Sequence, residues 1–143
     1  MKEESISFAL TGIKTEQFAA FEHNLPKDKK ADLTTALEFK VDKKERRIAT
    51  YAKFVFAQSE NVFLTIQVCC FFMIKPSAWQ RYSDDSKVVF PKNFLAHLAM
   101  LTIGSARGVL HAKTENTEFN DYMIPTINVN KIVKKEIEFP LDD

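Results

Sequence analysis

Glycine is scarce in this sequence, where Gly12, Gly104 and Gly108 are the only three among 143 residues. Three isolated glycines cannot build the glycine-rich loop that cradles a nucleotide phosphate. An excess of charge of one sign is also missing, because 20 Lys and Arg residues stand against 19 Asp and Glu residues. Without a positive field over the whole chain, nothing attracts it to nucleic acid or to an anionic membrane. We therefore expect no nucleic acid among its partners and no membrane insertion.

Long apolar runs and scattered cysteines are absent as well. No apolar run reaches the length of a membrane-spanning helix, and the segment Met1–Ser5 has no apolar signal core behind it. The two cysteines are adjacent, at Cys69 and Cys70. Neighbouring residues of a strand point to opposite faces, so these two are poorly placed to bridge each other or to share a metal. They indicate reduced, partly buried thiols and hence a cytoplasmic protein.

Motifs that carry catalysis or bind metal are missing too. His23, His97 and His111 do not stand at metal-ligand spacing, and no G-x-S-x-G nucleophile motif occurs. The carboxylate pair Asp84–Asp85 is better explained as solvated loop charge than as an acid–base pair. The basic run Lys43–Arg47 contains an acidic residue and is more typical of a charged hairpin tip than of a phosphate site. We expect no enzymatic activity, no metal and no cofactor.

Phenylalanine, by contrast, is abundant, with 13 residues, and alternation of apolar and polar residues dominates the first half of the chain. This alternation covers Leu33–Val41 and Ile48–Phe56, and a longer strand pattern follows over Val62–Ile74. Charged or polar turns separate the three segments, which predicts an antiparallel meander. An earlier alternation over Ile6–Leu10 predicts a first strand that ends near Gly12.

The registers of the three meander strands agree with one another. If Val41 pairs with Ile48, and Phe56 with Val62, one face of the sheet is apolar throughout. The second face is mixed and keeps several aromatic and sulfur-containing side chains. These side chains serve either ordinary packing or a binding surface.

Proline and polar residues indicate where loops and helices begin and end in the second half of the chain. The pattern breaks over Lys75–Ser86 and predicts a loop, after which Val88–Pro91 leads into a helix with proline near its first turn. The helix is expected over 91–109, followed by a polar loop from His111 to Asp121. Asn130 is placed to cap a short helix that runs to Lys134, with a strand as the alternative there. The chain 1–143 is thus expected to be a single α+β domain.

The long helix is apolar on nearly all sides. One stripe around Phe94, Leu98 and Leu101 is wide enough to cover a sheet. Gly104 and Gly108 share another face, where a second backbone can approach closely, unless Gly104 marks the end of the helix and Gly108 is a cap. A monomer with one sheet covers only one side of such a helix, so we predict a closed homo-oligomer, a tetramer, with this helix in the interface. The expected interface residues are Ala96, Met100, Ile103, Gly104 and Gly108.

Several segments, in this order and at this spacing, carry a family resemblance. Gly12–Glu22 resembles a first strand and the segment after it, and Val88–Pro91 resembles an aliphatic-Phe-Pro start of a long helix. Arg107–Gly108 matches an Arg-Gly at the end of that helix, and Pro125–Val129 resembles a Pro-aliphatic-Asn-aromatic segment before a last helix. Together with the meander, these segments are similar to the SecB-like family of protein-export chaperones.

The resemblance implies both a fold and a function. The fold is a four-stranded antiparallel meander sheet followed by a long helix and a short C-terminal helix. The function is that of an ATP-independent holdase, a homotetramer built as a dimer of dimers that holds unfolded polypeptides in apolar grooves. Members that serve toxin–antitoxin systems bind an aggregation-prone antitoxin instead. The expected partners are therefore unfolded clients, with an export motor or a single dedicated protein as open alternatives.

Candidates for client contact come from the mixed sheet face and from the expected loops. Each of them has ordinary packing or an oligomer contact as its alternative explanation. The candidates are Tyr51, Phe63, Phe71 and Met73 on the sheet, and Trp79, Phe119, Tyr122 and Met123 in the loops.

Overall fold

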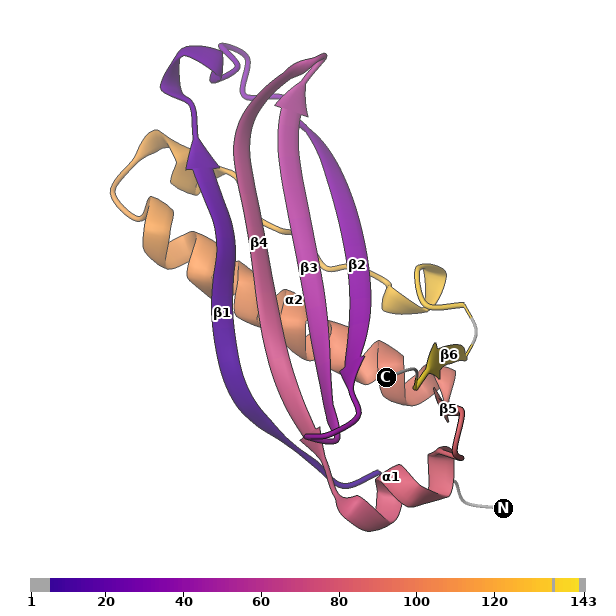
Figure 1. The fold of residues 1–143 in the computed structure, drawn as a ribbon. Helices are drawn as coiled ribbons and strands as arrows, with labels where there is room; N and C mark the ends of the chain where they lie inside the picture. The colour runs from indigo at the N-terminus through magenta and orange to yellow at the C-terminus, as the bar shows by residue number, and fades with distance from the viewer. Residues whose placement is uncertain (1–5, 135, 142–143) are drawn as a thin grey trace.

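Four long strands form one antiparallel sheet in the computed structural model, which describes residues 6–134 and 136–141 (Figure 1). The strands are β1 (Phe8–Ala20), β2 (Asp32–Asp42), β3 (Arg47–Gln58) and β4 (Asn61–Ile74). Their order is β1-β4-β3-β2, so the last three form the predicted meander and β1 pairs with β4. The expectation about Met1–Ser5 lies outside the described residues.

A second layer covers one face of this sheet. The helix α2 (Lys92–Thr114) crosses behind the strands in Figure 1 and packs on β3 and β4. The remaining elements are short: η1 (Glu22–Asn24), α1 (Pro76–Tyr82), β5 (Lys87–Phe90), η2 (Glu118–Asp121), η3 (Val129–Lys131) and β6 (Ile137–Pro140). β5 and β6 pair antiparallel as a small second sheet. The α+β fold is thereby confirmed, and the three-residue 3-10 helix η3 overlaps the short C-terminal helix that was predicted up to Lys134.

The register of the meander is confirmed in one hairpin and shifted in the other. Val41 pairs with Ile48 as predicted. Phe56 pairs with Leu64 rather than with Val62, because a bulge leaves Phe63 as an extra residue in β4. The shift is by two residues, and side chains alternate with a period of two, so the apolar face of the sheet is still the predicted one.

The first strand was predicted too short. β1 continues past Gly12 to Ala20, and its register with β4 slips between Leu10 and Gly12 and again between Thr15 and Gln17. Each irregularity interrupts the strict alternation of side chains between the two faces. The period-two pattern is therefore lost after Gly12 although the strand continues.

The segment predicted as a loop over 75–86 contains the helix α1. Pro76 stands in its first turn, where proline is tolerated, and Trp79 is buried against Phe90 with ring centroids 5.9 Å apart. Near the C-terminus, the side chain of Asn128, not of Asn130, caps η3 by accepting the Asn130 N–H at 3.1 Å.

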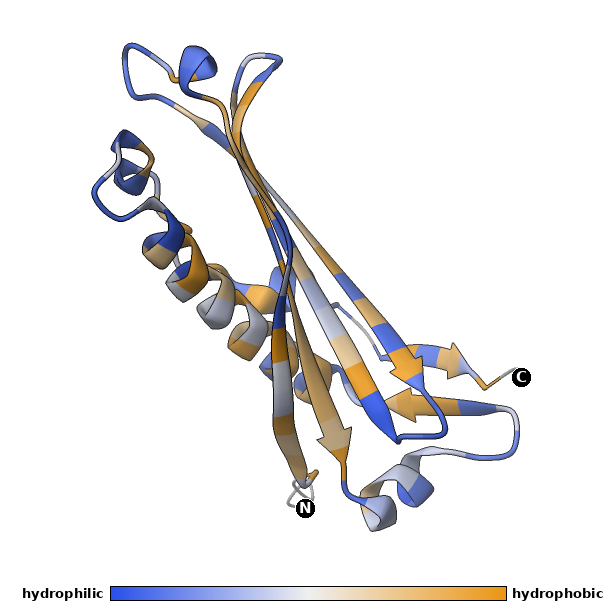
Figure 2. Ribbon diagram, turned by 60° about the vertical axis from the view of Figure 1, so that its left-hand side comes forward, coloured by the Kyte–Doolittle hydropathy of each residue, from blue (hydrophilic) through white to orange (hydrophobic). Residues whose placement is uncertain are grey.

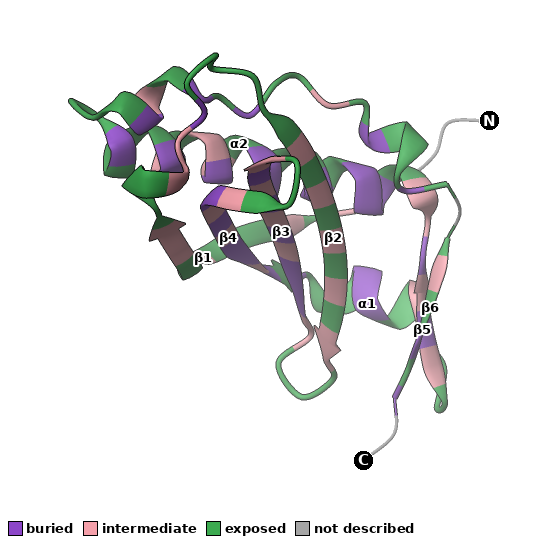
Figure 3. Cartoon of the chain, turned by 90° about the horizontal axis from the view of Figure 1, so that it is seen from above, coloured by how far each residue is buried: buried purple, intermediate pink, exposed green. Residues whose placement is uncertain are grey.

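The core lies between the sheet and α2, as the purple segments in Figure 3 show. The predicted helix stripe is rotated, because Leu101 is 38% exposed and a neighbouring row faces the sheet. The buried residues of α2 are Phe94, Leu95, Ala96, Leu98, Ala99, Thr102, Ile103, Ala106, Leu110 and Thr114. Gly104 and Gly108 lie inside the helix, so the alternative in which Gly104 ends it and Gly108 caps it is wrong.

Candidate functional site

An apolar groove of about 530 Å³ lies between β2 and the C-terminal segment. We call it the β2 groove. In Figure 3, seen from above, β2 lies at the edge of the large sheet and the β5–β6 pair stands to the side of it. The lining residues are Leu37, Glu38, Phe39, Ile132, Val133, Lys134, Ile137 and Phe139. All but Glu38 and Lys134 are apolar, and sequence reasoning missed the groove because its second wall comes from residues almost 100 positions further along the chain.

The first wall follows from the alternation along β2, visible as alternating colours in Figure 2. Leu37 and Phe39 pair with Ala52 and Thr50 of β3 and point to the same side of the sheet as α2. In the described part of the chain β2 pairs with a strand on one side only, and both side chains are half-buried instead of entering the core fully. Partial exposure of an otherwise regular core-facing row creates an apolar rim at this edge.

The second wall is anchored independently of the first. Arg107 on α2 donates two hydrogen bonds, from Nε to the carbonyl of Ile124 and from Nη2 to that of Pro125, each at 2.8 Å. Further along, Val133 and Phe139 are buried and fix the segment to the core. Ile132 between these anchors is 42% exposed. Because both walls are held by the folded chain, the groove exists before any partner arrives.

Three of the predicted client contacts on the sheet, Tyr51, Phe71 and Met73, lie on the face away from α2. There Lys40 stands over the ring of Tyr51 at 5.1 Å, and Arg47 stands over that of Phe71 at 4.8 Å. Met73, paired with Arg47 across the sheet, is exposed. Both rings are thus half-buried beneath cationic side chains, which leaves this face hydrated and only partly apolar.

The candidates expected in loops are mostly buried. Trp79 and Phe119 belong to the core, and Tyr122 packs on Phe63 with ring centroids 4.7 Å apart. Phe63, the extra residue of the β4 bulge, is fully buried as well. These four side chains are therefore buried in this fold rather than presented at its surface. Met123, by contrast, is exposed.

Of the residues expected at the oligomer interface, some are buried in the core and others lie at the surface. Ala96 and Ile103 are buried within the chain's own core, a correction to the predicted interface. Met100 is 56% exposed, and a Cβ added at Gly104 or Gly108 would meet nothing within 4 Å. α2 also contains no Asp or Glu at all. The outward face of α2 therefore has two positions without side chains and carries no negative charge.

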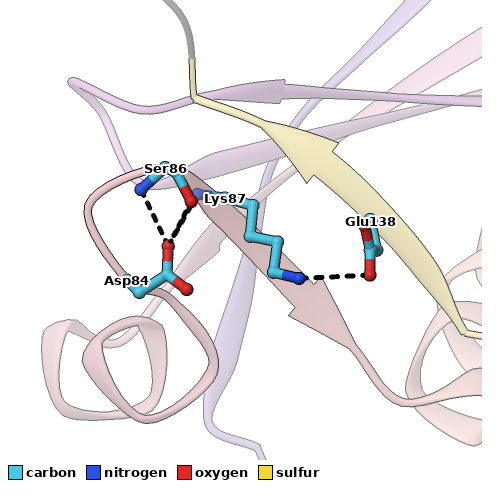
Figure 4. Close-up of polar contacts among 4 residues, drawn as sticks. All are labelled: Asp84, Ser86, Lys87 and Glu138. Atoms are coloured by element: carbon cyan, nitrogen blue, oxygen red, sulfur yellow. Dashed lines mark hydrogen bonds and ion pairs between the residues drawn. The ribbon is translucent and has the colours of Figure 1, made fainter.

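Asp84, considered from the sequence as half of an acid–base pair, stabilises the turn before β5. Asp84 accepts hydrogen bonds from the Ser86 N–H at 2.7 Å, the Ser86 hydroxyl at 2.8 Å and the Lys87 N–H at 2.9 Å (Figure 4). These bonds hold the pKa of the Asp84 carboxyl below its usual value. Lys87 in turn pairs with Glu138 at 3.2 Å and joins β5 to β6. Within residues 6–134 and 136–141, no group of three His, Cys, Asp or Glu side chains could hold a metal ion.

Both cysteines are buried and free, on opposite faces of β4. Cys70 belongs to the core, whereas Cys69 lies beside Tyr51 on the other face. Burial raises the pKa of the Cys69 thiol, which makes it a weak nucleophile at neutral pH. The prediction that neighbouring positions separate the two thiols is thereby confirmed.

Comparisons with known proteins do not assign a function to this chain. No protein-family model matches the chain, and no curated protein is similar to it. Among solved structures it is similar to a protein of unknown function from Streptococcus agalactiae, with 13% identity, a TM-score of 0.40 and coverage of 87% of this chain and 99% of that one. None of the helices in the described residues has the length and apolar character needed to cross a membrane.

Proposed function

We propose that this protein is an ATP-independent holdase of the cytoplasm, which binds unfolded or partly folded polypeptides in the β2 groove. The observation that carries the proposal is the groove itself, apolar on both walls and already formed in the free chain. A holdase needs apolar surface that stays hydrated and requires no catalytic centre. Lys134 supplies charge at the groove, and Glu38 and Lys40 supply it on the other side of β2, which keeps this apolar surface in solution.

A closed homo-oligomer, a tetramer, belongs to the same proposal, and its seam is the outward face of α2. Met100 and Leu101 are exposed there beside two glycines that leave the backbone accessible. Glycine inside a helix costs about 1 kcal/mol relative to alanine, and close approach of a second helix gives a reason for keeping it. Such a seam leaves the β2 groove open, because α2 and the groove present different surfaces of the chain.

Suppression of aggregation tests the holdase. A chemically denatured client is diluted into buffer without nucleotide, and light scattering is followed with and without the protein. Suppression at a stoichiometric amount of tetramer is expected, and its absence at that ratio refutes the proposal. Ile132→Glu should weaken suppression because it places a charge in the groove, whereas Ile13→Glu, at a comparably exposed isoleucine of β1, should not.

A chaperone or adaptor dedicated to one protein partner is the second candidate. It is favoured by the open sheet face, where cations cover the aromatic rings and leave less apolar surface for unrelated clients. A pull-down from native lysate separates the two candidates. Many unfolded precursors support the general holdase, and one stoichiometric partner supports the dedicated one. An export motor among the captured proteins would assign the holdase to protein export.

A further inference from the structure

Within residues 6–134 and 136–141, β1 and β2 are the two edge strands of the large sheet, and they differ in regularity. β1 pairs with β4 through two register slips, the first directly before Gly12. β2 pairs with β3 residue for residue, from Asp32 with Ala57 to Asp42 with Arg47, without any irregularity. Bulges bend and twist an edge away from further pairing, which is how many proteins protect such edges. β1 has this protection and β2 does not.

A regular edge strand offers backbone groups as well as side chains. Among the described residues, β2 is hydrogen-bonded to a strand on one side only, and alternate residues of an edge strand direct their N–H and C=O groups outward. The β2 groove lies beside this edge. The unpaired backbone groups and the apolar walls therefore adjoin each other.

The spacing of the groove side chains fits an extended partner. Leu37 and Phe39, two residues apart, point to the same side, and Ile132 and Ile137 line the groove across from them. A strand laid along β2 would direct every second side chain to this apolar side and the others to the charged side, where Glu38 and Lys40 lie. Backbone hydrogen bonds would bind peptides of many sequences, and the apolar groove would select those with an apolar side chain at every second position.

From this arrangement we propose that the outer edge of β2 binds an extended segment of an unfolded polypeptide as a fifth strand of the sheet, with alternate apolar side chains in the β2 groove. The occupant is a stretch of about six residues, the usual length of a strand, that alternates apolar and polar side chains and lacks proline. This inference rests on the proposed holdase function and specifies how that function recognises its clients.

Backbone methylation of a peptide tests the pairing directly. The probe is a fluorescent peptide of about eight residues with valine and threonine in alternation, a length close to that of ordinary strands. In two variants, N-methyl groups replace the amide hydrogens at either the odd or the even positions. Alternate N–H groups of a strand point to opposite edges, so one variant should lose binding by tenfold or more while the other binds like the parent. If both variants bind like the parent, or both lose binding equally, strand addition is refuted.

Protein variants connect the peptide to the groove. Ile132→Glu should weaken binding of the parent peptide about tenfold or more, through loss of apolar contact, and Ile13→Glu should leave it unchanged. Equal effects of the two substitutions would refute the assignment to β2. If a second copy of the chain already occupies the edge, the parent peptide does not bind and Ile132→Glu lowers the mass of the assembly, which also overturns the proposal.

The two proposals fail in distinguishable ways. If aggregation is suppressed but the methylated peptides behave alike, the holdase stands and strand addition falls. If one methylated peptide alone loses binding but no denatured client is protected, β2 recognises strands and the holdase falls.

Discussion

Replacing both glycines of α2 by alanine tests whether the outward face of this helix packs against another copy of the chain or faces water. Gly104 and Gly108 lie inside the helix, and an added Cβ at either position meets nothing within 4 Å in the isolated chain. In a monomer, each alanine should therefore stabilise the helix by about 1 kcal/mol without any clash. The double variant should then gain about 2 kcal/mol, which raises the melting temperature by roughly 4 to 8 °C in a chain of this size.

The same substitutions should have the opposite effect on a close helix–helix seam. Two methyl groups would separate the backbones that the glycines allow to approach, and the association should weaken. Native mass spectrometry and light scattering at micromolar concentration measure the mass, and thermal unfolding over a dilution series measures how melting depends on concentration. Ser105→Ala is the control, because it lies between the glycines and its hydroxyl only bonds back to the Leu101 carbonyl.

We expect the double variant to dissociate at concentrations where the parent and the control keep the mass of a tetramer. Once dissociated, its protomer should melt at a higher temperature than the parent protomer. A variant that keeps the parent's mass and simply melts higher would refute the seam at this face. A parent that is a stable monomer would refute the oligomer altogether.

Four further outcomes follow from the packing and the titrations. Tyr122→Ala should destabilise the fold by about 3 kcal/mol in urea unfolding, because it empties a buried aromatic site. Arg107→Lys keeps the charge but not the two-carbonyl geometry, and it should speed hydrogen exchange in β5 and β6 while α2 stays protected. The Asp84 carboxyl should titrate below 3.8 by NMR, so its stabilising effect is complete above that pH and is lost as pH falls through the lower folded pKa; Ser86→Ala should raise this pKa. The Cys69 thiol, whose pKa burial raises, should react with a thiol reagent at neutral pH more slowly than a free cysteine until the chain is unfolded.

The alternation of the meander predicted the large sheet well, because period-two patterns report directly which face is buried. The same rule could not place the bulge at Phe63 or the slips in β1, since an extra residue breaks the pattern from which register is inferred. The apolar character of Phe63 was plain in the sequence. Whether it faced outward depended on one inserted residue.

The candidate site was harder to predict than the fold. Leu37 and Phe39 appeared in the sequence as ordinary members of a core face, and nothing local indicates that β2 ends the sheet on that side. Ile132 and Ile137 lie in a segment with no clear period, and its position is fixed by Arg107 through backbone carbonyls that carry no sequence signal. The groove is thus a product of tertiary packing, which patterns along the chain do not report.

The central strand β4 also has a consequence for how the chain folds. β4 contains no charged residue from Asn61 to Ile74. Its second neighbour is β1, which is distant from it in the sequence and pairs with it from Phe8 opposite Ile74 onward. Hairpins such as β2–β3 and β3–β4 close in microseconds, whereas pairings between residues distant in sequence form later. During this interval one edge of an uncharged, β-prone strand is open to other chains. We therefore expect refolding yields to fall with protein concentration, with aggregates seeded at β4, until β1 docks.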